Sequence, residues 1–600
     1  MKNKVKIAIA APEIRLCDPG YNVGMCIEAA KEADKCGSDI IVFPELALTG
    51  ATAGDLYFQE ALVETAEAAL GEYVNATAEL SIMSFIGLPI SANGSLYNGV
   101  CAISEGEILG ITVSGADSRW FAPISDKGTS VEICGKKIQA GRDLIYTDED
   151  TRANIFVKIG DDNAFSRDGV NLILNPSAAP EYIGLARKRR EYAKRVSSAL
   201  GIPFVIAGAG EGESGTDGIY AAARLVSVGE KVVAEAEPFS KDILYAEIEV
   251  SKKKPQYAQG EEKGVEIMKH PFVPSDPCEL SAACELALTI QSRALARRIE
   301  RSYSKTAVIG VSGGLDSTLA VLVAARAMDV LSRDRKNVIA ITMPCFGTTE
   351  RTKSNALSLA EELGCSVRTI DIKAAVNQHF KDISHDEDSY DVVYENAQAR
   401  ERTQILMDVA NAEGGLVVGT GDLSELALGF ATYNGDHMSM YAVNASVPKT
   451  LMRAIISYAA DVAKTEGKDT LSAVLRDVIE TPVSPELLPL SDGENLQHTE
   501  SIVGSYELHD FFLYYTVKFG YSPRRVFDMA KEVFPEYDAS EIKKYLEVFA
   551  RRFYSQQFKR SCFPDGPRVT EISLSPRDAW QMPSDVSVNI WRENVANIKL

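Results

Sequence analysis

The chain has 600 residues, of which 46% are hydrophobic and 24% are charged, and its formal net charge is −21. This length allows about two to four domains with large apolar cores. The acidic balance argues against general nucleic-acid binding, which requires a basic surface, and no apolar run is long enough to predict a membrane span.

Cysteine and histidine usage favours a reducing compartment. The ten cysteines include no C-x-x-C pair, and the six histidines show no close H-x-x-x-H pairing. This pattern is typical of free thiols and argues against a zinc site. The N-terminal segment MKNKVKIAIAAPEIRL is interrupted by charges too early for a signal peptide, so we expect a cytoplasmic protein.

The first half of the sequence predicts an α/β domain over residues 1–250. Its apolar strands alternate with helices, and they include KIAIAAPE, DIIVFPE, MSFIGLPIS, VNLILNPSA and PFVIAGAG. A charged, turn-rich stretch, SKKKPQYAQGEEKG, indicates a linker over 251–277. A helix that starts near residue 278 then opens a second domain, 278–600, which repeats the α/β pattern and becomes mainly helical after residue 450.

The most informative segment of the second domain is Ser312-Gly-Gly-Leu-Asp-Ser317. It follows an apolar strand and precedes an apolar helix, so its amides and hydroxyls are expected at a helix N-terminus, where an anion is favoured. No Gly-Lys-Ser/Thr follows the glycines, which excludes the common nucleotide loop. Asp316 stands inside the turn, where a carboxylate suits a magnesium ion on a phosphate. An ordinary strand-to-helix turn is the simpler alternative.

Further polar segments follow the later strands of this domain. Because ligands bind at the carboxyl ends of strands in open parallel sheets, we expect these segments to meet. They contain Met343, Asn396, Arg400, Arg402, Thr420, Glu425, Tyr433, Asp436 and Lys449.

These motifs resemble two known families. SGGLDS resembles the pyrophosphate loop of ATP pyrophosphatases. Together with ENAQARERTQ, the stretch GTGDLSELALGFATYNGDHMSMYAVNASVPKT, and SPELLP, YELHDFFLYY and SQQFKRSCFPDGP, it is similar to NAD⁺ synthetases from about residue 270 to 600. The resemblance implies a Rossmann-like parallel-sheet ATP-pyrophosphatase domain with a helical tail. It also implies a reaction in which ATP adenylylates the nicotinate carboxylate of deamido-NAD⁺, pyrophosphate leaves, and ammonia displaces AMP.

The resemblance also implies roles for single residues. Asp316 and Glu425 would hold Mg²⁺, and Lys449 would stabilise developing negative charge, with Asp316 and Lys449 as catalytic residues. The residues implied for ATP are Ser312, Gly313, Gly314, Asp316, Ser317, Met343 and Thr420. Those implied for deamido-NAD⁺ are Asn396, Arg400, Tyr433, Asp436, Lys449 and Lys559.

Simpler interpretations exist for individual members of this set. Arg400 and Arg402 could form a solvated helix face, Glu425 could be a first-turn acid that favours the helix dipole, and Lys449 could lie in a surface turn. We expect His437 and His509 to be structural. The tail departs from the family pattern, because Ser575-Pro-Arg-Asp-Ala-Trp580 stands where a glycine-aspartate pair usually precedes the tryptophan.

The first domain resembles the nitrilase-like glutaminase that is fused to many NAD⁺ synthetases, an α/β/β/α sandwich. The resemblance rests on FPELALTG from Phe43, on GDLYFQEAL, on SLYNG and on GAGEGESGTDGIY. Such amidases use a glutamate base, a lysine and a cysteine nucleophile, which must reach its thiolate form to attack. Glu45 matches the base.

The other two catalytic residues of such an amidase are missing. Val113-Ser114-Gly115 stands where the lysine is expected, and Gly160 stands at the cysteine position. Cys134 lies too early in the strand order, without the acidic pair, and we interpret it as an ordinary thiol. We therefore expect a degenerate amidase site that contains Glu45, and a synthetase that uses free ammonia or receives it from a separate donor.

The sequence leaves two alternative functions open. One is another pyrophosphate-loop enzyme, such as a tRNA-thiolating or GMP-forming protein, against which the acidic charge and the ordered motifs argue. The other is a nucleotide-binding, non-catalytic assembly or regulatory protein. The resemblance implies a homo-oligomer, from a dimer up to an octamer, and the substrates deamido-NAD⁺, ATP and ammonia.

Overall fold

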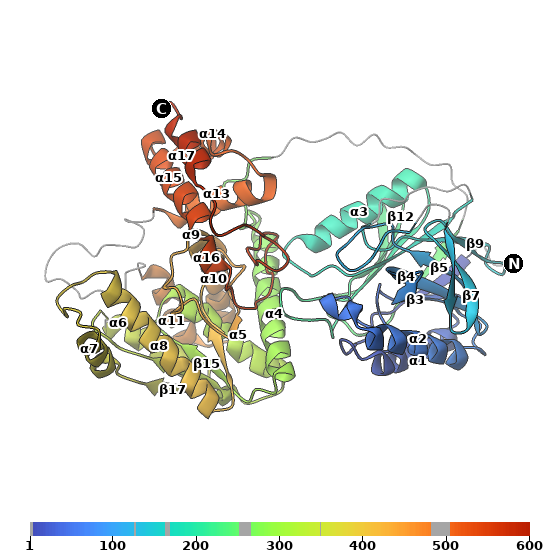
Figure 1. Ribbon diagram of the computed structural model, residues 1–600, viewed down its shortest axis with the longest axis horizontal. Helices are drawn as coiled ribbons and strands as arrows, with labels where there is room; N and C mark the ends of the chain where they lie inside the picture. The colour runs from blue at the N-terminus through green and yellow to red at the C-terminus, as the bar shows by residue number, and fades with distance from the viewer. Residues whose placement is uncertain (1–3, 125–127, 162–168, 251–265, 348–349, 482–503) are drawn as a thin grey trace. The chain divides into compact units, whose positions relative to one another are not determined.

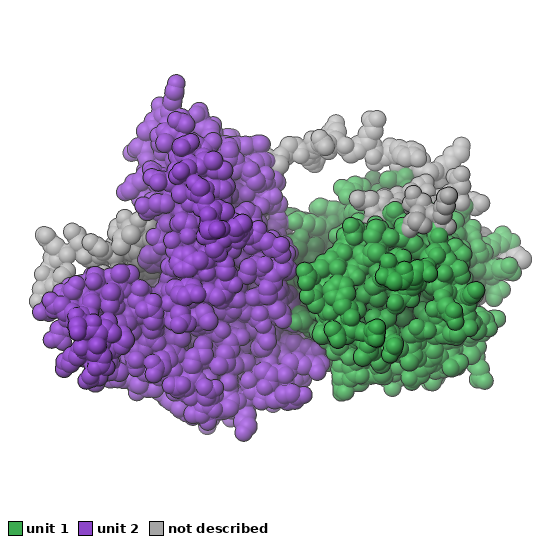
Figure 2. Space-filling view, in the orientation of Figure 1, with its two compact units in different colours: residues 1–214, 219–263 green, residues 215–218, 264–600 purple. Residues whose placement is uncertain are grey.

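The protein forms two compact units, coloured separately in Figure 2. The structure, a computed structural model, describes residues 4–124, 128–161, 169–250, 266–347, 350–481 and 504–600. One unit comprises residues 1–214 and 219–263, and the other comprises residues 215–218 and 264–600. The predicted linker residues 251–265 and the SPELLP motif at 484–489 lie outside the described ranges. The short segment 215–218 belongs to the second unit, although it lies inside the predicted first domain.

The first unit contains two sheets. The eight-stranded sheet has the order β14 (Leu244–Glu249), β1 (Lys4–Ile9), β2 (Ile40–Val42), β3 (Met83–Ala92), β4 (Ser95–Ser104), β5 (Glu107–Val113), β7 (Lys136–Gly141) and β6 (Thr129–Ile133). The six-stranded sheet has the order β13 (Lys231–Glu235), β12 (Arg224–Val228), β11 (Phe204–Gly208), β10 (Leu172–Ser177), β9 (Ala153–Val157) and β8 (Ile145–Asp148).

Helices cover the outer face of each sheet. Figure 1 shows α1 (Pro19–Lys35) and α2 (Glu60–Ala76) on one side of the sheets and α3 (Leu185–Leu200) on the other; a short 3₁₀ turn, η1, spans Gly54–Phe58. Successive side chains of a strand point to opposite faces of the sheet, so neighbouring residues contribute to two different cores. Ile7 and Ile9 of β1 face the core between the sheets, whereas Ala8 packs on the helix side. This arrangement confirms the predicted α/β/β/α sandwich.

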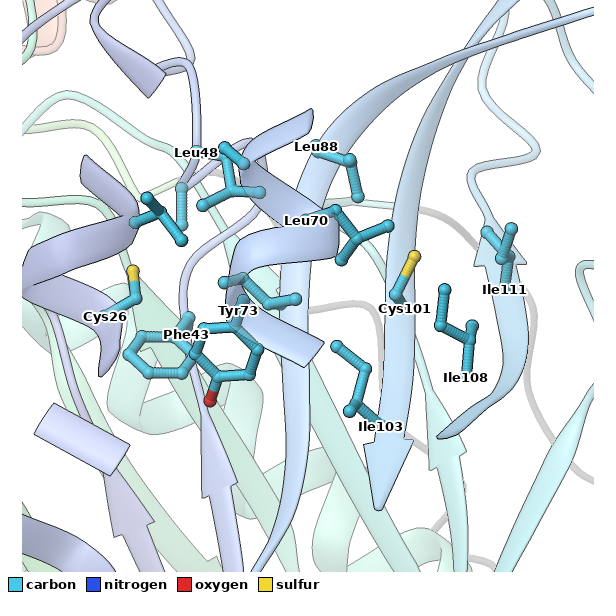
Figure 3. Packing of buried hydrophobic residues seen from close by; sticks show 14 of the residues in the cluster. Cys26, Phe43, Leu48, Leu70, Tyr73, Leu88, Cys101, Ile103, Ile108 and Ile111 are labelled. Carbon is cyan, nitrogen blue, oxygen red and sulfur yellow. The ribbon is translucent and has the colours of Figure 1, made fainter. Parts of the chain in front are cut away.

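The helix-side core of the larger sheet is shown in Figure 3. Leu70 and Tyr73 of α2 lie against Cys101 and Ile103 of β4 and are fully buried or nearly so. The Tyr73 hydroxyl is 2.9 Å from Ser84 Oγ, so this buried phenol has a hydrogen-bond partner. Cys101 is therefore a core residue, and burial raises its thiol pKa.

The second unit is built on one parallel sheet. Its order is β17 (Ser366–Thr369), β16 (Val338–Thr342), β15 (Ala307–Gly310), β18 (Leu416–Gly419) and β19 (Tyr441–Ala442). The chain runs outward from β15 to β16 and β17 and then returns to β18 on the other side. The segments that leave the carboxyl ends of β15 and β18 therefore lead to opposite sides of the sheet, and ligands bind at such a point in open parallel sheets.

Helices pack on both faces of this sheet, as parallel sheets require. The helices that surround it are α4 (Pro277–Arg301), α5 (Leu315–Val330), α6 (Glu350–Glu362), α7 (Lys373–Asp382), α8 (Val392–Ala412), α9 (Leu423–Leu428), α10 (Lys449–Thr465) and α11 (Asp469–Glu480), with a 3₁₀ turn, η2 (Arg335–Asn337). The helical tail comprises α13 (Tyr506–Phe519), α14 (Pro523–Val533), α15 (Ala539–Ser555), α16 (Gln557–Arg560) and α17 (Asn589–Ala596). This arrangement confirms the predicted fold of the second half. None of the helices in the described ranges is both long and apolar enough to cross a membrane.

Candidate active site

A cavity of about 880 Å³ opens at the carboxyl ends of β15 and β18. It brings together every residue that the sequence predicted for the synthetase chemistry. These are Ser312, Gly313, Gly314, Asp316, Ser317, Met343, Asn396, Arg400, Thr420, Glu425, Tyr433, Asp436, Lys449 and Lys559. Glu45 lies in the first unit. Asp578, from the altered tail segment, is not among the residues that line this cavity.

The loop after β15 presents the start of α5 to the cavity. Gly313 has a φ of +86°, a conformation that favours glycine, and Gly314 is the N-cap of α5. No described side chain caps the first turn, so its amides face the cavity without a side-chain acceptor. Within the loop, the Ser317 hydroxyl donates to Gly314 O at 3.2 Å. The result is a set of donors arranged for an anion.

Lys449 occupies the centre of an acidic cluster. Its Nζ lies 2.6 Å from Asp316 Oδ1, 2.7 Å from Asp422 Oδ2 and 3.0 Å from Glu425 Oε1, and the residue is 3% exposed. Burial lowers the pKa of Lys449, but its three carboxylate neighbours more than offset this and raise the pKa well above its usual value. Lys449 is therefore a permanent buried cation, and the alternative of a surface turn is excluded.

The pKa values of the carboxylates Asp422 and Glu425 are also raised, which favours their neutral form. Burial raises the pKa of Glu425 to about 7, although Lys449 opposes the shift, and burial also raises the pKa of Asp422 well above its usual value. One carboxylate oxygen from each of Asp316, Asp422 and Glu425 lies within 4.8 Å of the other two. Such a set of carboxylate oxygen donors fits a magnesium ion, whose charge would favour their ionised form.

Sequence reasoning did not assign Asp422 to the site. Asp422 is the N-cap of α9, and its Oδ1 accepts the Glu425 amide at 2.9 Å, so it fixes the start of the helix that carries Glu425. The sequence signal that could have identified Asp422 is its position, directly after an apolar strand and three residues before Glu425. That spacing is typical of ordinary helix caps, so the sequence alone does not reveal that the second carboxylate oxygen faces Lys449.

Asp510 of α13 holds the first turn of α10, where Pro448 provides no side-chain cap. Its Oδ2 accepts the Thr450 amide at 3.1 Å and the Thr450 hydroxyl at 2.7 Å. Its Oδ1 accepts the Ser424 hydroxyl, and Ser424 Oγ in turn accepts the Lys449 amide at 2.9 Å. Burial raises the pKa of Asp510 to about 6, against the opposing effect of these hydrogen bonds. The helical tail thus fixes the position of Lys449.

The helical tail also provides hydrogen-bond donors for the carbonyl oxygens at the carboxyl end of α9. Arg560 is fully buried and donates to Leu426 O at 3.1 Å and Ala427 O at 2.9 Å. Lys559 donates to Gly429 O at 2.7 Å and Ala431 O at 2.6 Å. Cations at the last carbonyls of a helix are favoured by their charge and by their hydrogen bonds. Both ends of α9 are therefore held.

The opposite wall of the cavity is formed by α8 and the 432–438 loop. Asn396 Oδ1 accepts the Thr432 hydroxyl at 2.8 Å, and Arg400 Nη2 donates to Tyr433 O at 3.3 Å. Asp436 accepts the Thr432 amide at 2.6 Å. These predicted residues therefore shape the loop as well as line the cavity, which excludes a purely solvated helix face for Arg400.

His437 and Tyr433 complete the wall. His437 Nδ1 is 2.9 Å from Thr432 O, and its Nε2 is 3.3 Å from Cys562 Sγ, as expected for a structural histidine. Tyr433 is 45% exposed, and its ring centroid lies 5.6 Å from that of Phe558. This aromatic pair is available for stacking with a planar ligand ring.

In the first unit, Glu45 faces Gly160. A Cβ on Gly160, whose φ is +55°, would lie 3.6 Å from both Glu45 carboxylate oxygens. Position 160 is therefore where a nucleophile side chain would meet the base. Asn98 Nδ2 donates to Glu45 Oε2 at 2.8 Å, and burial raises the pKa of Glu45 to about 7 despite this bond. Residues 162–168, which follow Gly160 closely, lie outside the described ranges.

Two further residues bear on the amidase prediction, Gly115 and Cys134. A Cβ on Gly115 would lie 2.3 Å from the guanidinium carbon of Arg142, so this arginine fills the adjacent space. Cys134 sits in the turn between β6 and β7, where its amide donates to Glu67 Oε1 of α2 at 2.7 Å. Burial and the Glu67 charge raise the pKa of the Cys134 thiol, the opposite of what a nucleophile needs.

Comparison with known proteins agrees with this architecture. Residues 6–255 match the family model for carbon–nitrogen hydrolases, and residues 288–557 match the model for NAD synthases. A glutamine-dependent NAD⁺ synthetase of Mycobacterium leprae is 34% identical over 98% of this chain and 97% of its own length. One from Aquifex aeolicus is 26% identical over 91% of this chain and 93% of its own length.

A solved structure shares the fold over the same length. The glutamine-dependent NAD⁺ synthetase of Cytophaga hutchinsonii superimposes with a TM-score of 0.79 at 20% identity and covers 99% of each chain. Fold and site thus define a fusion of two units. One is a carbon–nitrogen hydrolase unit, and the other is a parallel-sheet unit whose glycine-serine loop, residues 312–317, suits phosphates. Within that class, the chain belongs to the family of glutamine-dependent NAD⁺ synthetases.

We predict that Asp510→Ala destabilises the second unit by about 2–4 kcal/mol. The substitution leaves the Thr450 amide and hydroxyl and the Ser424 hydroxyl without their buried acceptor. Scanning calorimetry measures the loss. Asp528→Ala is the matched control: this helical aspartate is exposed and pairs with Arg524, so we expect a change below about 1 kcal/mol. Equal losses in the two variants would contradict the role of Asp510.

We also predict a pH-dependent effect of Glu45→Gln. The folded chain keeps the Glu45 proton up to about pH 7, whereas the unfolded chain releases it at lower pH, so stability falls as pH rises through this window. Glutamine does not ionise, so the variant does not lose stability as the pH rises, and its side-chain oxygen can still accept the hydrogen bond from Asn98. Thermal unfolding should therefore show Glu45→Gln stabilised by up to about 3 kcal/mol at pH 8 and little changed at pH 4. Glu60→Gln, at an exposed position, is the control. A pH-independent effect would contradict the prediction.

Proposed function

We propose that this chain synthesises NAD⁺ from deamido-NAD⁺ and ATP in the 880 Å³ cavity, and that it takes its nitrogen as ammonia. The observation that carries the first part is the Lys449 cluster beside the glycine-serine loop, within a chain of this family. The observation that carries the second part is the glycine at position 160, opposite Glu45.

The reaction requires activation, because a carboxylate is a poor electrophile. An oxygen of the nicotinate carboxylate attacks the α-phosphorus of ATP, and the bond from that phosphorus to the bridging oxygen breaks. Pyrophosphate leaves with the electron pair. Ammonia then attacks the carbonyl carbon of the mixed anhydride, AMP leaves, and a proton is lost. The product is the amide.

The first step brings two anions together, so charge neutralisation is its main requirement. Lys449 lies in the cavity as a permanent cation and would stabilise charge that develops on the α-phosphate. The open amides at the start of α5, with the Ser312 and Ser317 hydroxyls, would bind the β- and γ-phosphates. Asp316, Asp422 and Glu425 would hold Mg²⁺, which supplies further neutralisation at the phosphates.

The remaining lining residues suit the two nucleotides. Thr420 and Met343 lie at the ends of β18 and β16, beside the loop, and would contact ATP. Tyr433, with Phe558 next to it, would stack on a planar ring of deamido-NAD⁺, while Arg400 and Lys559 supply positive charge nearby. Asn396 and Asp436 would fix the loop that carries Tyr433.

The first unit supports the proposed use of ammonia. Amide hydrolysis by an amidase of this family type needs a nucleophile beside the base, and hydrogen is the only side chain at position 160. The curated relatives reported above are named as glutamine-dependent, so this chain would differ from them in its nitrogen donor. The retained sandwich would then serve as a scaffold for assembly of the oligomer.

We expect Lys449→Met and Glu425→Gln to lower ammonium-dependent NAD⁺ formation by about 10²–10³-fold, because each removes charge from the site of phosphoryl transfer. The assay follows NAD⁺ and AMP with deamido-NAD⁺, ATP, Mg²⁺ and ammonium. Lys464→Met changes an exposed lysine in the last turn of the same helix and should leave the rate unchanged. A folded Lys449→Met variant with nearly full activity would rule out this site.

A comparison of nitrogen donors tests the second part of the proposal. We expect the purified chain to form NAD⁺ with ammonium and to release no glutamate from glutamine. Cys134→Ala should change neither result, because its thiol lies against α2 and not beside Glu45. Efficient glutamine-dependent NAD⁺ formation that Cys134→Ala abolishes would overturn the proposal of a lost glutaminase.

A further inference from the structure

Four residues from the first half of the sequence belong to the second unit. They are Gly215–Gly218, which we call the strap, and the chain returns to the first unit directly after them. The Tyr441 hydroxyl of β19 donates to Gly215 O at 2.6 Å, and the Gly566 amide donates to Thr216 O at 2.9 Å. The main chain of the strap therefore accepts two hydrogen bonds within the second unit.

Asp217 fixes the middle of the strap to the tail segment whose sequence departs from the family pattern. Its Oδ1 accepts the Ser575 hydroxyl at 2.9 Å. Both carboxylate oxygens lie 2.9 Å from Arg577 Nε, and Oδ1 also accepts Nη2 at 2.5 Å. The two side chains of this ion pair are 17% and 33% exposed. Because an arginine fork binds a carboxylate in a fixed geometry, the strap holds the Arg577 guanidinium in one orientation.

Arg577 in turn holds the segment 557–566, which runs from the cavity of about 880 Å³ to the strap. Its Nη1 donates to Phe563 O at 2.9 Å. Phe563 is buried and belongs to an apolar cluster with Leu426 of α9 and Ala442 of β19. A series of direct contacts therefore connects the strap with the elements that border the cavity.

The other end of this segment forms the cavity wall that carries Tyr433. Phe558 and Lys559 line the cavity, and the Phe558 ring lies beside that of Tyr433. Cys562 Sγ lies 3.3 Å from His437 Nε2, and the rings of His437 and Tyr433 have centroids 5.5 Å apart. Only a few residues separate the two ends of the segment, so a displacement at the strap moves the wall.

The strap also supplies acceptors for buried donors. Tyr441 and Gly566 are buried, and a Cβ at position 566 would lie 2.2 Å from Ala442 O. Buried donors are nearly always paired, so this close packing on β19 depends on the strap carbonyls. Asp565 is held separately, by the Arg298 guanidinium and by the Ala442 amide, which donates to Asp565 O at 2.7 Å. The segment therefore keeps part of its attachment when the strap is altered.

We propose that Asp217 is a positioning residue for the candidate active site, and that it acts through Arg577 on the wall formed by Tyr433, Phe558 and Lys559. The inference rests on the proposed function for the ligand of that wall, deamido-NAD⁺. Besides a scaffold for assembly, the first half of the sequence would supply a part that the synthetase site needs. A second unit without the strap would lack this support, which gives a physical reason to keep both units in one chain.

Steady-state kinetics of the full chain, with ammonium as nitrogen donor, test the positioning role. We expect Asp217→Ala to raise the KM for deamido-NAD⁺ about tenfold and the KM for ATP less than about twofold, because the strap acts on one wall of the cavity. Asp217→Asn keeps an acceptor for Ser575 and Arg577 but loses the charge, so a rise of about threefold is expected. This variant carries the test if Asp217→Ala does not fold. Asp528→Asn, at an exposed ion pair of the tail, is the matched control and should change neither constant.

Thiol labelling gives a readout that needs no substrate. Cys562 is half-buried beside His437, whereas Cys284 of α4 is fully buried and Cys278 is exposed. We expect iodoacetamide to label Cys562 several-fold faster in Asp217→Ala than in the wild type, because the segment that carries this thiol is held less firmly. The labelling rates of Cys278 and Cys284 should not change. Acceleration at Cys284 would indicate a general loosening of the unit and would contradict a local role.

The outcomes separate this proposal from the proposed function. An unchanged KM for deamido-NAD⁺ in a folded Asp217→Ala variant would overturn the positioning role, as would unchanged labelling of Cys562. An equal rise in the KM values for ATP and deamido-NAD⁺ would also contradict it, since the strap is expected to act on one wall. If Cys562 labelling accelerates but the wild type forms no NAD⁺, the positioning role stands and the proposed function fails.

Discussion

The contact between Lys449 and its three carboxylates is the constraint on which the second unit depends. Asp316 follows β15, Asp422 and Glu425 follow β18, and Lys449 opens α10, so four ionisable side chains from three separate strand-to-helix connections meet at one point. A buried cluster of this kind is expensive to form, since each ion loses its water, and breaking it leaves an uncompensated charge. The protein keeps it where phosphates would arrive, which is the arrangement of a binding site more than that of a stabilising core.

The surrounding structure holds this cluster in place from outside the sheet. Asp510 of the helical tail binds the first turn of α10, and Arg560 binds the last carbonyls of α9. The tail is therefore part of the site, although neither residue lines the cavity of about 880 Å³. This explains in physical terms why a parallel α/β unit carries a tail of further helices.

Much of the site could be predicted from the sequence, because its residues sit in linear motifs at the ends of apolar strands. Asp316, Glu425 and Lys449 were identified in this way, and the structure brings them together. Asp422 and Asp510 were not identified, since a helix-capping aspartate and an aspartate in an aromatic helix have ordinary local explanations. Their roles depend on which helices meet in three dimensions.

The first unit illustrates how fold and chemistry separate. Its sandwich is held by apolar side chains that alternate between the sheet cores, and this packing does not depend on a nucleophile. Glycine at position 160 tolerates the left-handed backbone conformation at that turn and leaves Glu45 with Asn98 as its side-chain partner. The sequence therefore preserves the scaffold of a carbon–nitrogen hydrolase, and we propose that it has lost the groups for amide hydrolysis.

The exchange of labelled pyrophosphate into ATP tests the central claim most directly. The chain is incubated with ATP, Mg²⁺, labelled pyrophosphate and deamido-NAD⁺, with no nitrogen donor present, so that only adenylylation and its reversal can occur. The account predicts that label enters ATP, and that it does so only when deamido-NAD⁺ is added. An absence of exchange, or exchange that is independent of deamido-NAD⁺, would contradict an adenylylation site built around Lys449.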